Sequence, residues 1–193
     1  MKVGGVSGSR YEARVRELVE DFPGLAAIAE LNVRRVMRQQ LAILHKMLLD
    51  TVRGDPVCRR LMTAPGVGAV VALTYRATVD QPQRFVHSRA VGAHVGLTPK
   101  RYQSGEIDYD GGVSKSGDAL LRTMLYEAAH SLLIQSRKWS WLKAWGMRVA
   151  QRRGIRRAIV AVARRLAVVL HRMWVDGSEF RWSKGSAAVP TVA

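Results

Sequence analysis

The chain has 193 residues, 48% of them apolar, and its 31 Lys and Arg outnumber 15 Asp and Glu to give a formal net charge of +16. This apolar content supports a packed core and argues against general disorder. So large a positive charge repels itself inside a compact fold, so the composition predicts a polyanionic partner. Of the basic residues 24 are arginines, whose planar guanidinium pairs bidentately with phosphate.

The sequence also argues against disulfides, metal sites, a signal peptide and membrane-spanning segments. Cys58 is the single cysteine, so neither an intrachain disulfide nor a zinc site of several thiolates can form. The five histidines lack H-x-H and H-x-x-x-H spacing, so we expect no metal site in this chain. Residues 1–8 lack the apolar stretch of a signal peptide, and no apolar run reaches the roughly 20 residues that cross a bilayer. We therefore expect a cytoplasmic protein with no membrane partner.

The N-terminal part predicts helices. Residues 1–9 are rich in Gly and Ser and are expected to be flexible. Helices are predicted for about Tyr11–Asp21, broken at Pro23, and for about Leu25–Val52. Apolar residues recur along the second helix at helical spacing, so it forms either a coiled coil, with another helix or another chain, or a core helix of one compact domain. These residues are Leu41, Leu44, Leu48 and Val52.

A glycine turn between two helical segments is the first candidate site. The pattern predicts a helix over Val57–Thr63, a turn at Pro65-Gly66-Val67-Gly68, and a helix that starts with Ala69–Leu73. Glycines let a backbone approach a ligand closely, and the amides that start a helix favour phosphate. Gly66 and Gly68 are therefore candidate nucleic-acid-binding residues of a helix-hairpin-helix, which grips the DNA backbone. A plain helical turn is the alternative.

The rest of the chain predicts more helix and a small β-hairpin. The segment 177–193 is of low complexity and is predicted to be a disordered tail. The predicted elements are a loop at 81–83, helices over Ser88–Val95, Gly117–Gln135, Trp139–Gln151 and Ile155–Val175, and a small β-hairpin or an extended loop over Lys100–Gly112. The buried face of the last helix is expected to hold Ile155, Ile159, Leu166, Val169 and Leu170.

Ser104 is the candidate nucleophile. It precedes a glycine in a turn expected to be exposed, close in sequence to Lys100 and Arg101. A serine hydroxyl attacks phosphorus when a base accepts its proton and cations stabilise the phosphoryl oxygens. The two cations are candidate phosphate ligands, but no base is evident. A Ser-Gly pair in a hairpin is most often a simple turn.

The segment after the hairpin combines helix capping with positive charge. Ser114 or Ser116 is predicted to cap the helix that follows. Lys115 and Arg122 would lie near the first turns of this helix, where a phosphate can bind, and are further candidate nucleic-acid-binding residues. The alternative is an ordinary capped helix with solvated charges.

A basic face runs along the last helices. Arg153 and Arg157 share it, at a spacing of four residues. Tryptophans lie just upstream, and aromatic rings beside arginines suit stacking on unpaired bases. The interpretation we favour for at least two of the tryptophans is that they belong to the core, with the charges forming a solvated face. The residues concerned are Arg152, Arg153, Arg156, Arg157, Arg164, Arg165, Trp139, Trp141 and Trp145.

Several blocks in a fixed order resemble a known family. P-G-V-G at 65–68 is followed by Phe85, G-L-T-P at 96–99, Ser104-Gly105, and S-K-x-G-x-x-x-L-R at 114–122. This order is similar to the C-terminal domain of the Piv-like insertion-sequence transposases, whose members include the bridge-RNA-guided recombinases. The similarity covers roughly Leu61–Leu132, and the helices that follow also fit.

The resemblance implies an enzyme of two parts. An N-terminal RuvC-like domain holds divalent metal, expected to be Mg²⁺, on four acidic residues, and the C-terminal domain supplies a serine that forms a transient covalent link to DNA. That serine corresponds to Ser104, with Ser114 the less favoured candidate. A coiled-coil segment joins the two domains and corresponds to Leu25–Val52. A guide RNA becomes a candidate partner beside DNA.

The chain departs from the family pattern in two ways. The residues before Leu61 are too few for the RuvC-like domain, so we expect no cofactor in this chain and no DNA cleavage by this polypeptide alone. A fragment, a truncated or decayed gene and one half of a split protein all stay open. Asp118 stands where the family has Asn; it can cap a helix but would repel a nearby phosphate.

The sequence therefore predicts a mainly α protein, a helical bundle with a helix-hairpin-helix-like element and a small β-hairpin, preceded by a long coiled-coil-like helix. The expected domains are a helical linker over 10–54 and a DNA-binding domain over 55–176. The favoured function is DNA binding by a transposase C-terminal domain in transposition or site-specific recombination, with self-association through the long helix. The alternatives are a non-catalytic helix-hairpin-helix nucleic-acid-binding protein and a protein that dimerises without nucleic acid.

Overall fold

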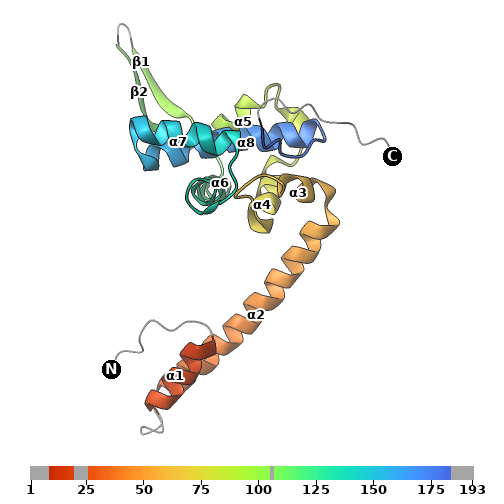
Figure 1. Cartoon of the computed structure of the whole chain (residues 1–193), viewed down its shortest axis with the longest axis vertical. Coiled ribbons are helices and arrows are strands. Elements are labelled where there is room, and N and C mark those ends of the chain that lie inside the picture. The colour runs from red at the N-terminus through yellow and green to blue at the C-terminus, as the bar shows by residue number, and fades with distance from the viewer. Residues whose placement is uncertain (1–8, 20–25, 105–106, 184–193) are drawn as a thin grey trace. The chain divides into compact units, whose positions relative to one another are not determined.

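The computed structural model describes residues 9–19, 26–104 and 107–183, and the chain divides into two compact units, residues 1–49 and 50–193. The prediction of a mainly helical protein with a small antiparallel hairpin is confirmed (Figure 1). None of the described helices is both long enough and apolar enough to cross a membrane.

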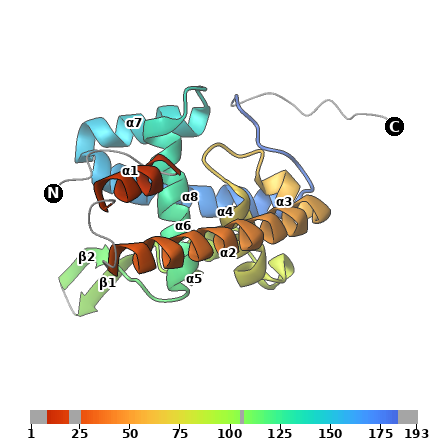
Figure 2. The same ribbon diagram turned by 90° about the horizontal axis from the view of Figure 1, so that it is seen from below.

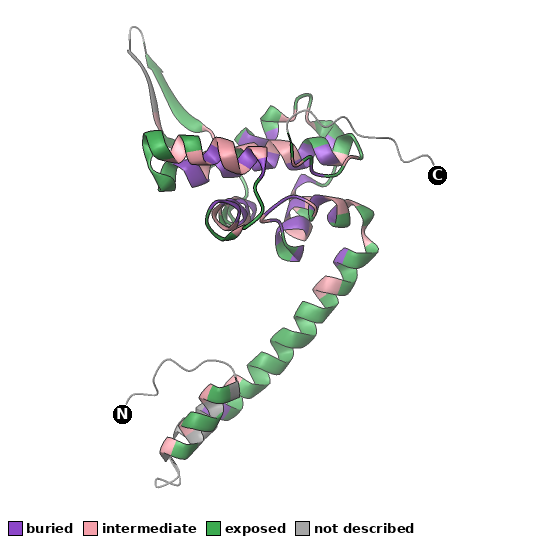
Figure 3. Cartoon of the chain, in the orientation of Figure 1, coloured by how far each residue is buried: buried purple, intermediate pink, exposed green. Residues whose placement is uncertain are grey.

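Two helices make up the described part of the first unit. α1 (Ser9–Val19) and α2 (Ala26–Gly54), which continues into the second unit, lie close to their predicted ranges. Within the first unit, the guanidinium carbon of Arg34 lies 4.0 Å from the ring centroid of Tyr11. Beyond this contact α2 is exposed from residue 35 to residue 47 (Figure 3). The apolar residues Leu41 and Leu44 therefore face solvent.

The core of the second unit is built around α8 (Ile155–Val175). α6 (Ala119–His130) is seen end-on in Figure 1 and lengthwise in Figure 2, so it crosses α8 at a steep angle. α7 (Trp141–Arg153) packs closely on α8, because a Cβ on Gly146 would lie only 2.6 Å from Cγ2 of Val162. The fully buried side chains of α8 recur at helical spacing and include Ala158, Val162, Leu166 and Leu170.

Two shorter helices complete this core. α3 (Pro56–Leu61) is capped by Asp55, whose carboxylate accepts a hydrogen bond of 2.7 Å from the Val57 amide, and Pro56 suits the first helical position. α4 (Ala69–Val79) packs against α3 and α6. The buried hydroxyl of Tyr75 donates a 2.8 Å hydrogen bond to the carbonyl of Ala167, which ties α4 to α8.

A buried histidine fixes the segment that leads from α4 to the hairpin. This segment holds the 3₁₀ turn η1 (Pro82–Arg84), predicted as a loop, and α5 (Arg89–His94). His171 of α8 has Nδ1 3.0 Å from the Ser88 hydroxyl and Nε2 2.9 Å from the Pro82 carbonyl oxygen. These contacts hold the start of α5 against α8.

The hairpin extends away from the helices of its unit (Figure 1). Its strands are β1 (Pro99–Ser104) and β2 (Ile107–Val113), and the register pairs Ser104 with Ile107 at the far end. A bulge near the base places an additional residue of β2 opposite β1. At the other end of α6, the chain forms a π-helical turn, η2 (Ser131–Gln135).

Burial differs from the sequence expectation at three places, the first being Val169 of α8, which is only half-buried. Ile155 is 40% exposed, because it opens α8 where the chain reverses after α7. Trp139 is exposed, and Trp141 and Trp145 are half-buried, so the interpretation of two core tryptophans is wrong. α7 uses the small Gly146 and Leu142 against its neighbours, which leaves the indoles at its edge.

The end of the described chain packs on α7. Phe180 is buried, and its ring stacks on that of Trp141 with centroids 6.3 Å apart. The backbone carbonyl of Arg181 accepts a 2.8 Å hydrogen bond from the Trp141 indole. The segment predicted as a tail is thus described as far as residue 183, and 184–193, like the residues 1–8 predicted to be flexible, lie outside the described residues.

Candidate nucleic-acid interface

Three of the predicted site residues lie on the hairpin, and all three are exposed. Ser104 ends β1, and no side-chain hydrogen bond joins it to a described residue. Lys100 and Ser104 share one face of the strand, about 13 Å apart at roughly 3.3 Å per residue, and Arg101 lies on the other face. A single phosphate group therefore cannot contact all three side chains. The hairpin is a basic arm with a hydroxyl near its end.

The base of the hairpin is fastened by a tight turn. The Ser114 amide donates to the Thr98 carbonyl at 2.8 Å, and the Lys115 amide to the Gly96 carbonyl at 3.1 Å. Gly96 has φ +68° and lies so close to Ser116 that a Cβ would clash with its carbonyl oxygen. Lys115 itself adopts φ +57°, which is uncommon for a residue with a side chain. The turn places the Lys115 side chain at the surface, where it is exposed.

Arg122 holds this turn from α6. Its Nη1 lies 3.0 Å from the carbonyl oxygen of Lys115, 3.3 Å from that of Val95 and 3.4 Å from that of Ser116. One end of the guanidinium is therefore committed to backbone carbonyls. Arg122 was predicted to bind phosphate, and its observed contacts give it a structural role at the hairpin base.

The cap of α6 differs from the prediction. Asp118 is the N-cap, and its carboxylate accepts a 2.6 Å hydrogen bond from the Leu121 amide. Ser114 and Ser116 do not cap the helix; their hydroxyl oxygens lie 3.0 Å from each other. Asp118 takes the cap because it directly precedes the first helical residue, the position from which a short side chain reaches the third amide of the helix.

The two glycines of the Pro65–Gly68 turn have different surroundings. Gly66 has φ +82°, and a Cβ there would clash with the carbonyl oxygen of Ala128 on α6. The close backbone approach that Gly66 permits is therefore to α6. Gly68 is exposed, a Cβ added to it would have no atom within 4 Å, and its successor Ala69 starts α4. Of the two, Gly68 is the one that a ligand could reach.

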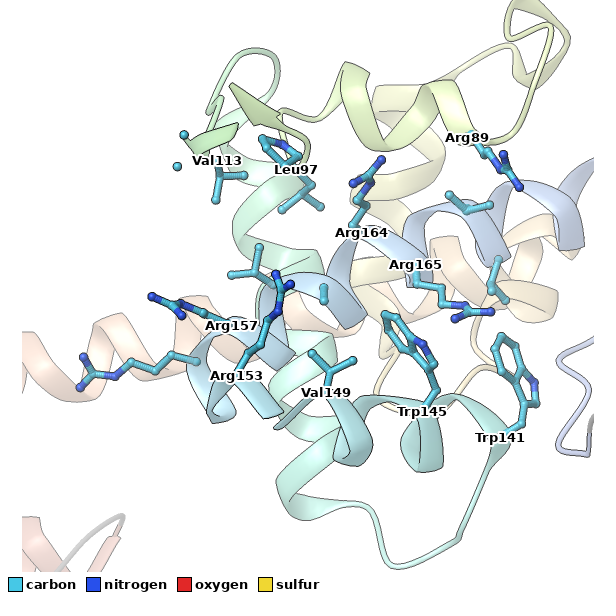
Figure 4. Close-up of a pocket in the computed structure, with 18 of the residues that line it drawn as sticks. Arg89, Leu97, Val113, Trp141, Trp145, Val149, Arg153, Arg157, Arg164 and Arg165 are labelled. Atoms are coloured by element: carbon cyan, nitrogen blue, oxygen red, sulfur yellow. The ribbon is translucent and has the colours of Figure 1, made fainter. Parts of the chain in front are cut away.

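An arginine-rich groove of about 1000 Å³ lies between α5, α7, α8 and the base of the hairpin (Figure 4). Arg153 and Arg157 lie toward one end, and Trp141 and Trp145 toward the other, with Val149 between them. The hairpin contributes Pro99 and Val113. We call this the arginine groove; its arginines are Arg89, Arg153, Arg156, Arg157, Arg164, Arg165 and Arg172, and no acidic residue lines it.

The charges of the arginine groove are not neutralised by the protein. Among the residues that the structure describes, none of its arginines forms an ion pair. Arg165 is half-buried, and its guanidinium carbon lies 4.4 Å from the ring centroid of Trp145 and 5.2 Å from that of Trp141. Burial lowers the pKa of Arg165, and the charge of Arg148 lowers it further. An anion beside Arg165 would raise this pKa again, because an opposite charge favours the charged form of the guanidinium.

The predicted site residues thus fall into separate places. Arg153 and Arg157 lie in the arginine groove, Lys100 and Arg101 on the hairpin that borders it, and Lys115 and Arg122 at the hairpin base. Two arginines of the groove were not predicted from the sequence. Arg172 continues the helical spacing of Arg157 and Arg164 and could have been found, whereas Arg89 comes from α5, which no local pattern connects to α8.

Comparison with known proteins identifies the segment that holds the hairpin. Residues 58–146 match the sequence profile of the IS116/IS110/IS902 transposase family. This segment is similar to that transposase family. The matched segment runs from α3 into α7 and contains both glycine turns, Ser104 and Arg122, whereas α8 lies beyond it. The resemblance to insertion-sequence transposases is confirmed, and the assignment to a C-terminal, guide-RNA-dependent domain stays a prediction.

Individual transposases are similar over more of the chain. The chain is 30% identical over 185 residues to the transposase for insertion sequence element IS1111A of Coxiella burnetii, in an alignment covering 86% of this chain and 50% of that protein. It is 31% identical over 91 residues to the transposase for IS1328 of Yersinia enterocolitica, covering 47% of this chain and 27% of that protein. The chain therefore spans half the length of the Coxiella transposase.

The potential metal donors of the described chain form no cluster of three or more. Within the described ranges, no three His, Cys, Asp or Glu side chains gather in a way that could hold a metal ion. The described residues therefore do not fit the Mg²⁺ site that the resemblance implies for the family.

Proposed function

We propose that this chain is the DNA-binding part of an insertion-sequence transposase and that Ser104 is its nucleophile. The observation that carries the proposal is the exposed hydroxyl of Ser104 at the end of a basic hairpin, inside the segment that matches the transposase family. Cations along β1 and in the adjoining arginine groove would hold DNA phosphates on the approach to that hydroxyl.

The proposed reaction is a strand transfer through a serine ester. Oγ of Ser104 attacks a DNA phosphorus, a new O–P bond forms, and the bond to one deoxyribose oxygen breaks, which leaves that strand with a free hydroxyl. The seryl proton passes to a base outside the described surroundings of Ser104. Lys100 and Arg101 lie farther along β1 and would bind neighbouring phosphates of the same strand, which positions the attacked phosphate at Ser104. The metal-binding acids expected from the family would come from a RuvC-like domain.

The test supplies a RuvC-like domain of the same family in trans, together with the DNA of the insertion-sequence ends. We expect a covalent protein–DNA adduct that migrates as a shifted band in denaturing gels and disappears with Ser104→Ala. Ser114→Ala is the matched control and should keep the adduct. An adduct that survives Ser104→Ala would refute the nucleophile assignment.

A second candidate function is structure-selective nucleic-acid binding without catalysis. It is favoured by the arginine groove, whose residues require no nucleophile. On this hypothesis Ser104→Ala leaves binding and every cellular effect unchanged. Both hypotheses predict an affinity that falls steeply with salt, because bound phosphates release their counterions. Absent or salt-insensitive binding would count against both.

Self-association is proposed for α2. Met37, Leu41, Leu44 and Leu48 follow the alternating four- and three-residue spacing of a coiled-coil seam. Leu41 is 66% exposed and Leu44 61% exposed, so the described chain leaves this seam available to a second copy.

A further inference from the structure

The arginine groove contains more than phosphate binding needs. A site for duplex backbone requires cations on an accessible surface and no aromatic ring. This groove also has half-buried indoles, from Trp141 and Trp145, and apolar side chains such as Val149 between its two ends. A ligand that matches it carries negative charge and a flat apolar face, which is the description of an unpaired nucleotide.

The two kinds of side chain are separated along the groove. Arg165 and Trp145 make one end, where the guanidinium lies 4.4 Å from the indole centroid, so this end is a stacking platform. Arg153 and Arg157 lie at the other end (Figure 4). Arg157 and Arg165 are eight residues apart on α8, about 12 Å at 1.5 Å per residue. The groove is therefore long enough to hold more than the base of one nucleotide.

We propose that the arginine groove binds unpaired nucleotides of single-stranded DNA, with a base stacked on the platform of Trp145 and Arg165 and the adjoining phosphates on Arg153, Arg157 and Arg164. In a duplex the base faces are stacked on one another and cannot reach half-buried indoles. The choice of DNA rests on the proposed function, since strands of the transposon must separate during transfer. Pro99 and Val113 line the groove, so a bound strand leaves it toward the hairpin that carries Ser104.

The first experiment separates base stacking from charge. Binding of the full chain to a labelled oligo(dT) is compared, by fluorescence anisotropy, with binding to an abasic strand of the same length and charge. We expect oligo(dT) to bind about tenfold more tightly and to quench tryptophan fluorescence. Trp145→Leu should abolish this preference but leave the abasic affinity unchanged, whereas Trp145→Phe should retain most of it. Trp139→Leu, outside the groove, is the matched control.

The second experiment tests the phosphate ligands. Arg157→Gln combined with Arg164→Gln should weaken oligo(dT) binding at least tenfold and lower the slope of log K against log salt by about 1.4, at roughly 0.7 per phosphate contact. The control pair, Arg59→Gln with Arg137→Gln, removes the same charge from exposed positions outside the groove. It should have less than a twofold effect.

The outcomes distinguish this inference from the proposed function. Equal affinity of the wild type for oligo(dT) and the abasic strand, without quenching, would overturn the groove assignment even if Trp145→Leu failed to fold. Tighter binding to duplex than to oligo(dT) would overturn it and leave the proposed function standing. Oligo(rU) binding tenfold more tightly than oligo(dT) would replace DNA with RNA as the occupant. If the chain bound no DNA of any kind, the proposed function itself would be refuted.

Discussion

The guanidinium of Arg122 donates a 3.0 Å hydrogen bond to the backbone carbonyl of Lys115, across the base of the hairpin. Lys115 has a positive φ, so the turn that displays its side chain is held in an uncommon backbone conformation. A basic residue in a basic protein thus binds the protein's own backbone. This hydrogen bond joins the two ends of the sequence block at 114–122, the S-K pair and the L-R pair.

Replacement of Arg122 should therefore destabilise the fold. Arg122→Gln removes charged hydrogen bonds to three carbonyls and is expected to lower the free energy of unfolding by about 1–3 kcal/mol. Urea denaturation measures the change. Arg122→Lys should recover only part of the loss, because an ammonium group cannot match the planar fork. If Arg122→Gln left the stability unchanged but weakened DNA binding, Arg122 would be a phosphate ligand instead.

The two glycines of the α3–α4 turn should respond in opposite ways. Gly66→Ala places a methyl group against the Ala128 carbonyl at a positive φ, and we expect a loss of at least about 2 kcal/mol of stability. Gly68→Ala meets open space at φ −96° and should change stability by less than about 0.5 kcal/mol. Thermal melting of the pair measures both. Equal destabilisation by the two substitutions would show that the turn geometry is not as described.

Asp118 offers a test of its capping role. Asp118→Ala removes the acceptor for the Leu121 amide and should cost about 1 kcal/mol, whereas Asp118→Asn keeps an acceptor oxygen and should cost little. Asn is also the residue that the family pattern has at this position. If Asp118→Asn tightens DNA binding while keeping stability, the carboxylate repels a nearby phosphate. If Asp118→Ala unfolds at the wild-type melting temperature, the capping role is refuted.

Stability should fall in alkaline solution. Burial and the neighbouring Asp55 raise the pKa of the Cys58 thiol from 9.0 to about 12, and burial also raises the pKa of Tyr75. Both groups stay protonated in the folded chain above the pH at which they ionise when unfolded. The stability they contribute is therefore complete below about pH 9 and is lost as pH rises toward 12, by about 1.4 kcal/mol per pH unit and group.

Cys58→Ala isolates the thiol in this effect. We expect its unfolding free energy, measured in urea at pH 8 and pH 10, to change less with pH than that of the wild type. Tyr75→Phe should flatten the dependence only above pH 10, where the unfolded phenol ionises. The explanation fails if Cys58→Ala has the pH dependence of the wild type.

The exposed seam of α2 predicts self-association. Leu41→Glu with Leu44→Glu should convert a dimer or larger assembly to a monomer in sedimentation velocity. The control pair, Gln39→Glu with Ala42→Glu, adds the same groups at exposed positions on the side of the helix away from the seam. A wild-type chain that sediments as a monomer at all concentrations would end this proposal.

Local sequence signals were sufficient to define the elements. Helical periodicity, the Pro and Gly breaks and the alternation around Ser104 predicted the observed helices and the hairpin, because each of these signals acts within a few residues of chain. The same local signals located Arg157 and Arg164 on one face of α8, whereas Arg153, expected on that face, ends α7 before the break at Gly154. They placed Ser104 in an exposed turn, whereas its choice as nucleophile came from the resemblance to the transposase family.

Long-range packing established what the charged residues face. Gly66 and Arg122 were expected at a phosphate, and the fold turns both toward the protein's own backbone carbonyls. Arg89 joins Arg172 in one groove because His171 holds the start of α5 against α8. Packing of α7 on α8 through Gly146 leaves Trp145 at the edge, beside Arg165. These relations depend on contacts between residues far apart in the chain, and no local pattern encodes which distant surface a side chain will meet.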